Sequence, residues 1–197
     1  MGMEEIYKSA LSQFATHGYE GASMGSIATE VGIRKSSIYA HFKGKDDLFL
    51  QVVKYAFQKQ TLRIFRYFSD REDTPLEQTL HSFLIWMGQE YESSKTAKFM
   101  LRVLFFPPVS LCNKIVDIAN PFLESMDQQL IRLLRNARHK EPFGHMEPVD
   151  VAQSFMTLLD GIMVELLHSG SISYQRRLNI AWPVFWRGIT LIQSHEA

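Results

Sequence analysis

The chain has 197 residues, of which 46% are hydrophobic and 12% aromatic, so it has ample material for a packed core, and this argues against disorder. Its 21 basic residues are balanced by 21 acidic ones, so any binding to nucleic acid must come from a local patch. The single cysteine, Cys112, excludes an internal disulfide and a cysteine-based zinc site.

The amino terminus gives no sign of export. It lacks a basic segment followed by an apolar stretch, and no apolar run approaches the roughly 20 residues of a membrane span. We therefore expect a cytoplasmic protein that has no membrane partner.

The first 50 residues predict three short helices and the start of a long one. The first covers residues 3–17 and ends at Gly18. Ser23 can cap the second, Gly32 makes a turn, and a fourth helix begins at Lys45 or Asp46. Apolar residues at helical spacing mark the buried faces: Ile6, Ala10, Leu11 and Phe14; Ile27, Ala28 and Val31; Leu48, Phe49, Val52, Val53, Ala56 and Phe57.

The stretch between Gly32 and Lys45 is the one best suited to touch another molecule. It holds basic residues at positions 34, 35, 43 and 45 and no acidic residue. A helix from about Lys35 to Phe42 would bury Ile38 and Phe42 and leave small hydroxyls and basic groups on its other face. Such a face can enter the major groove of DNA. The pattern indicates the recognition helix of a helix-turn-helix module, and a solvated basic turn is the alternative.

Six short motifs stand in a characteristic order in this region: Phe14-Ala-Thr-His-Gly18-Tyr19, Ser23-Met24, Ile27-Ala28, Gly32-Ile33, Ile38-Tyr39-Ala40-His41-Phe42 and Lys45-Asp46-Asp47-Leu48. Together they resemble the TetR family of bacterial transcriptional repressors over about the first 50 residues. The resemblance implies an all-α protein with a three-helix helix-turn-helix domain at residues 1–47. A long helix would join it to a helical ligand-binding and dimerisation domain at residues 48–197.

The resemblance also implies roles for single residues. Ser23 would touch a phosphate, Lys35, Ser36 and Ser37 would face the groove, and Tyr39, His41 and Lys45 would hold the DNA backbone. Two positions depart from the family pattern. Ala22 stands where threonine is frequent, and Arg34 stands where a serine often caps the recognition helix. Arg34 loses the cap but brings a guanidinium that can reach the groove, so it joins the expected DNA-binding residues. Tyr39 could instead pack, and His41 could be an ordinary surface residue.

The remainder of the chain also predicts helices, at residues 75–92, 96–106, 111–139, 148–168 and 174–194. Pro121 is expected to kink or break the third of these, and Pro183 to kink the last or mark its start. No strand-like alternation appears in the sequence.

The last two helices are apolar on two faces, which is typical of helices shared between a core and a partner. The family dimerises through its last two helices, so we expect a homodimer, with a core of one chain as the alternative. A second apolar row holds Ile180, Val184 and Leu191. The expected interface residues are Met156, Met163, Leu166, Leu178, Trp182, Phe185 and Ile189.

No catalytic motif is found in the sequence, so we expect no enzyme, no catalytic residue and no cofactor. Glu165 and His168 have the spacing of one half of a di-iron site, but such sites need a second pair. Glu77/His81 and Glu141/His145 have a different spacing. We therefore expect no metal.

The carboxy-terminal part is rich in aromatic residues and methionine, so a cavity there could hold a small apolar or amphipathic effector. Candidate lining residues, each of which could equally be ordinary core, are Trp86, Phe99, Met100, Val103, Phe122, Met126, Phe155 and Leu159. The resulting hypothesis is a repressor that binds a palindromic operator in double-stranded DNA as a homodimer and is released by its effector. The alternatives are an activator, or a helical scaffold with a helix-turn-helix remnant.

Overall fold

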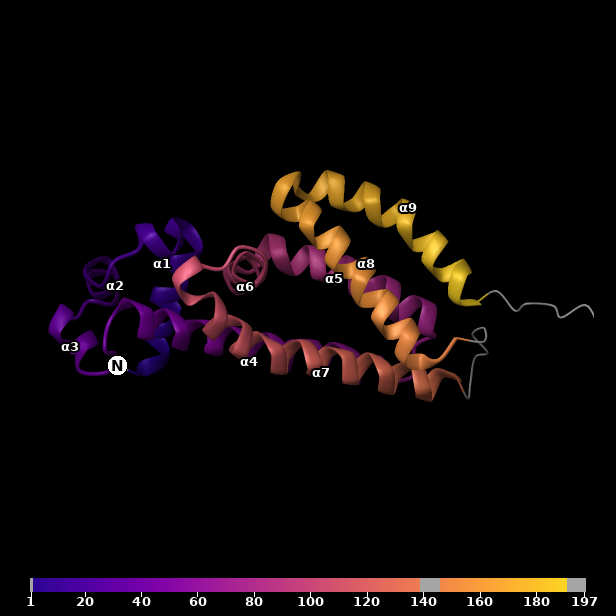
Figure 1. Ribbon diagram of the computed structural model, residues 1–197, viewed down its shortest axis with the longest axis horizontal. Coiled ribbons are helices and arrows are strands. Elements are labelled where there is room, and N and C mark those ends of the chain that lie inside the picture. Colours follow the sequence, from indigo (N-terminus) through magenta and orange to yellow (C-terminus); the bar gives the residue numbers. More distant parts are fainter. Residues whose placement is uncertain (1, 139–145, 191–197) are drawn as a thin grey trace, which may run out of the picture. The chain divides into compact units, whose positions relative to one another are not determined.

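The computed structural model describes residues 2–138 and 146–190, and within these ranges the chain is helical with no strand, as predicted (Figure 1). The elements are α1 (Met3–Gly21), α2 (Met24–Val31), α3 (Lys35–Tyr39), α4 (Lys45–Ser69), α5 (Leu76–Ser93), α6 (Lys95–Phe105), a 3-10 turn η1 (Val109–Leu111), α7 (Cys112–Arg138), α8 (Pro148–His168) and α9 (Gly170–Thr190).

These helices pack into two compact units. The first comprises Met1–Thr61 with Ser93–Phe122, and the second comprises Leu62–Glu92 with Leu123–Ala197. The division by packing thus differs from the functional boundary expected after residue 47, which stays a prediction.

The first unit is built around aromatic side chains from α1, α4 and α6. The Phe14 ring lies edge-on to Phe49, with 4.8 Å between ring centroids, and Phe99 of α6 lies 5.7 Å from Phe49. Lys95 Nζ donates to Ser12 Oγ at 2.8 Å and fastens the start of α6 to α1. At Gly18 the backbone takes φ 71°, so the regular part of α1 ends where the sequence predicts.

The second unit is held by α5, α8 and α9, and α8 packs along α9 (Figure 1). Phe83 and Phe155 are fully buried in its core, and their rings lie 6.3 Å apart. The Tyr174 hydroxyl of α9 donates to the carbonyl oxygen of Leu84 on α5. Burial raises the pKa of Tyr174, so its hydroxyl remains protonated and acts as a donor.

Several helix limits differ from those expected. α9 begins at Gly170 rather than 174 and continues through Pro183, and α7 continues through Pro121. A proline removes one hydrogen bond within a helix, and packing on neighbouring helices can offset that loss. Among the described residues no single helix is long and apolar enough to cross a membrane, although Lys95–Phe105 and Val109–Ala137, bent by 83°, reach that length and apolarity together.

Candidate functional site

The caps of α2 and the turn after it set the orientation of α3 relative to α2. Ser23 caps α2, and its Oγ accepts from Ser26 N at 3.0 Å. At the other end Gly32 takes a left-handed conformation, φ 78° and ψ 30°, and Ile33 N donates to Ala28 O at 2.9 Å. This is a typical glycine helix stop. The predicted helix-turn-helix geometry is therefore present.

The third helix, α3, is shorter than expected. It ends at Tyr39 rather than Phe42, although Ala40 N still donates to Ser36 O and Phe42 N to Ile38 O. Ile38 is fully buried and Phe42 is 3% exposed, so these two side chains fasten the segment to the module. The side opposite them faces solvent.

Most of the residues expected to touch DNA are exposed to solvent. The exposed ones are Ser23, Arg34, Lys35, Ser36, Ser37, Tyr39 and His41. Tyr39 is 48% exposed, with Lys35 Nζ 5.8 Å from its ring centroid, so it is not a core residue. Arg34 occupies the cap position of α3 without a side-chain cap bond, as expected from the sequence. The roles of these residues on DNA stay a prediction.

Lys45 differs from the exposed DNA-binding candidates, because its side chain is half-buried and contacts other residues of the chain. Its Nζ donates to Glu20 O at 3.1 Å and lies 4.5 Å from the ring centroid of Tyr19. The Tyr19 hydroxyl donates to Asp46. Burial, followed by Asp46, raises the pKa of Tyr19 to about 12, so the hydroxyl keeps its proton. These contacts tie the end of α1 to the start of α4, a role for Tyr19 that the sequence did not suggest.

Three acidic side chains of the module accept hydrogen bonds within it. Glu30 accepts from Gln13 Nε2 at 2.6 Å, Asp47 accepts from Lys43 N at 2.9 Å, and Asp46 accepts from Tyr19. Arg34 and Lys35 meanwhile stand exposed on the recognition face. The exposed basic side chains can therefore attract phosphate at this face, although the module as a whole is not basic.

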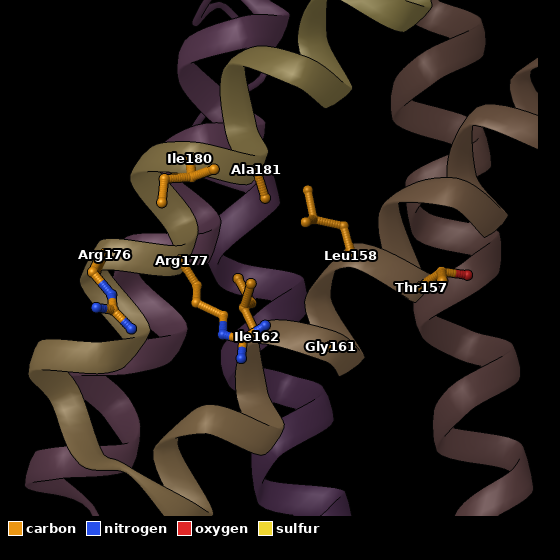
Figure 2. A pocket seen from close by; sticks show the side chains of 8 residues that line it. All are labelled: Thr157, Leu158, Gly161, Ile162, Arg176, Arg177, Ile180 and Ala181. Atoms are coloured by element: carbon orange, nitrogen blue, oxygen red, sulfur yellow. The ribbon is translucent and has the colours of Figure 1, made fainter.

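A second feature is a groove of about 460 Å³ that is lined by residues of α8 and α9. It is lined by Thr157, Leu158, Gly161, Ile162, Arg176, Arg177, Ile180 and Ala181. Figure 2 shows Leu158 of α8 and Ala181 of α9 pointing toward one another. Ile180 is 65% exposed and Val184, one turn further along α9, is 71% exposed. Large apolar side chains left in water mark a surface suited to a protein partner.

The residues expected at the dimer interface lie mostly inside the chain. Met163, Leu166, Leu178, Trp182 and Ile189 are buried, and Met156 and Phe185 are half-buried. The Phe185 ring packs 5.7 Å from Phe155, which is fully buried. On α9, Ile180 and Val184 are apolar residues that face solvent. Both belong to the second apolar row of the sequence analysis, not to the row expected at the interface. Leu191 of the second row lies outside the described residues.

The candidate effector residues are divided between the two units. Phe99, Met100, Val103 and Phe122 are buried in the first, and Met126, Phe155 and Leu159 are buried in the second. Trp86 of the second unit is half-buried, and its ring lies 5.0 Å from that of Tyr67. Their contact with an effector stays a prediction.

The sequence patterns considered for metal have other partners. Glu165 accepts from Arg177 Nη2 at 2.8 Å, and the His81 ring stacks on Trp182 at 4.9 Å. Glu141 and His145 lie outside the described residues. One group that the sequence analysis did not select is the buried carboxylate of Glu90, which pairs with Arg63. Its position seven residues after Phe83, on the apolar stripe of α5, was the available signal.

Comparison with known proteins agrees with this geometry. Residues 6–52 match the family model described as bacterial regulatory proteins, tetR family. The HTH-type transcriptional repressor AcnR of Corynebacterium diphtheriae is 27% identical over 188 residues, which cover 90% of this chain and 87% of that protein.

Two solved structures share the fold. A TetR-family transcriptional regulator from Agrobacterium tumefaciens has a TM-score of 0.73 at 18% identity, with 95% of this chain and 97% of that chain covered. The regulator FadR of Bacillus subtilis, solved in complex with stearoyl-CoA, has a TM-score of 0.70 at 15% identity, with 95% and 100% covered. The helix-turn-helix at residues 6–52 therefore matches the tetR family of bacterial regulatory proteins, and the chain as a whole resembles an HTH-type transcriptional repressor and shares the fold of a TetR-family regulator.

Proposed function

We propose that this regulator is a repressor that occupies a palindromic operator as a homodimer and leaves it when a small apolar or amphipathic effector binds. The observation that carries the proposal is that α3 exposes Lys35, Ser36 and Ser37 to solvent while Ile38 is buried in the module. Such a regulator acts in the cytoplasm, where the operator is.

Each polar group on this face has a suitable partner on DNA. The Arg34 guanidinium can bind guanine O6 and N7 together, and hydroxyls such as that of Ser37 can bond to several bases. Ser23, Tyr39, His41 and Lys45 are assigned to phosphates, which orient the module but carry no sequence information.

The groove on α8 and α9 supports the homodimer. A two-fold interface uses the same patch on both copies, and the exposed Ile180 and Val184 beside an open groove suit a second copy of the same helices. One recognition helix reads only a few base pairs. Two of them, held about 34–36 Å apart or a multiple of that distance, read a palindrome.

The effector is assigned to the helical domain. Its aromatic and methionine side chains suit an apolar or amphipathic molecule, and the FadR structure holds such a molecule on the same fold. α4 carries residues of both units, from Lys45 to Ser69, so a shift of this helix would change the separation of the two recognition helices. A tenfold release requires about 1.4 kcal/mol of difference in effector affinity between the two states.

The test is transcription in vitro from a promoter that carries a duplex selected by the protein. A repressor lowers the amount of transcript, and an effector restores it. An increase in transcript would instead identify an activator. No change, together with no selected duplex, would favour a helical scaffold that keeps a helix-turn-helix remnant.

A further inference from the structure

A buried carboxylate in the second unit has an oxygen that receives no hydrogen bond from the described part of the chain. Glu90 of α5 is 7% exposed, and its Oε1 accepts from Arg63 Nη2 of α4. Its other oxygen, Oε2, is buried and accepts no hydrogen bond from any described residue. Burial of an unpaired carboxylate oxygen is costly, so this atom is suited to receive a donor from outside the chain.

Aromatic rings lie one helical turn from this carboxylate. Trp86 precedes Glu90 by four residues and therefore lies on the same face of α5, about 6 Å along the helix axis. On α4, Tyr67 follows Arg63 by one turn, and its ring lies 5.0 Å from Trp86 and 5.3 Å from Phe83. The seam between α4 and α5 thus combines one buried negative charge with the faces of aromatic rings.

The group has a route to solvent. The Arg63 side chain is 54% exposed, and Trp86 is half-buried. The Arg63 guanidinium can therefore move into water at little cost, since its far side is already hydrated. The carboxylate cannot do so, because Glu90 lies within the seam.

We propose that the effector is an amphipathic cation whose protonated amine binds Glu90 and whose apolar part packs on Trp86. A carboxylate beside aromatic faces attracts an ammonium group through charge and through the ring quadrupole. An anionic effector would bring a second negative charge toward Glu90 and would leave Oε2 unpaired. This inference depends on the proposed release by an effector and names the chemical class of that effector.

The test measures direct binding to the full-length protein, without DNA, by calorimetry. The probes are phenylbutylamine, phenylbutanol and phenylbutyrate, which share one apolar part and differ in charge. We expect the amine to bind the wild type most tightly. Glu90→Gln keeps the shape of the side chain and removes the charge, so the affinity for the amine falls about tenfold or more while that for the alcohol changes little. Glu92→Gln, at an exposed position of the same helix, is the matched control and leaves amine binding unchanged.

A second variant keeps the proposal testable if Glu90→Gln does not fold. Arg63→Ala removes the competing guanidinium, so the amine should bind more tightly than to the wild type. Equal amine binding by the wild type and folded Glu90→Gln would overturn the proposal, as would tighter binding of phenylbutyrate or no binding of any probe. Operator affinity is measured separately, so a failure of this inference is distinct from a failure of the repressor assignment.

Discussion

The ring of Tyr174 on α9 lies directly against Gly88 on α5, so that a Cβ added at Gly88 would come within 2.7 Å of Tyr174 Cε1. Together with the bond from Tyr174 to the Leu84 carbonyl, this contact fixes the start of α9 on α5. Glycine usually lowers the stability of a helix, but at position 88 the missing side chain leaves the space that the Tyr174 ring occupies.

Gly88→Ala should therefore destabilise the protein by about 1–3 kcal/mol, because the ring and the backbone must move apart. Urea denaturation measures the change. Gly188→Ala is the control, since a Cβ there meets open space within α9, and it should be neutral or stabilising by up to about 1 kcal/mol. Equal effects of the two changes would contradict the close contact.

Lys45→Ala should weaken binding to all duplex sequences together and make the dependence on salt shallower, because one phosphate contact is lost. Titrations at several salt concentrations measure the slope. Lys54→Ala, at an exposed position of the same helix, should leave it unchanged.

Lys45 also holds Glu20 and Tyr19, so the loss of affinity has a second possible origin. Tyr19→Phe separates the two, because it removes the bond to Asp46 without changing a basic charge. If Tyr19→Phe alters the salt slope as much as Lys45→Ala does, Lys45 acts through the junction and not on a phosphate.

Arg34→Ala and Ser37→Ala should change which sequences are preferred, because their exposed side chains can meet base edges. Loss of one bidentate arginine contact costs about 1–3 kcal/mol of discrimination at one base pair. Competition among single-base variants of the operator measures it. An unchanged preference would refute the assignment to bases.

Ile180→Glu should yield monomers in sedimentation velocity, because it places a charge in the exposed groove where the second copy is expected. The matched control is Ile172→Glu, which makes the same change on the same helix at a residue that is 86% exposed and outside the groove lining. Intact dimers with Ile180→Glu would mean that the interface lies elsewhere.

The helix-turn-helix could be predicted from the sequence because its signals are local. Ser23 caps the helix that follows it, and Gly32 takes the left-handed conformation that few other residues tolerate. Both act within a few residues of the chain, so neither depends on the position of the rest of the molecule.

The inner and outer faces of the last two helices could not be assigned in the same way. Met163 and Leu178 are buried within the chain, whereas Ile180 is exposed, although all three occur in apolar rows with helical spacing. Periodicity identifies an apolar face but does not specify whether the same chain or a partner covers it. That choice depends on tertiary packing.

Selection from a random pool of duplex DNA at about 150 mM salt, followed by anisotropy titration of the selected sequence, tests the central claim most directly. The account predicts enrichment of a palindrome that binds two chains. Weak, salt-sensitive binding to every duplex without enrichment would contradict it.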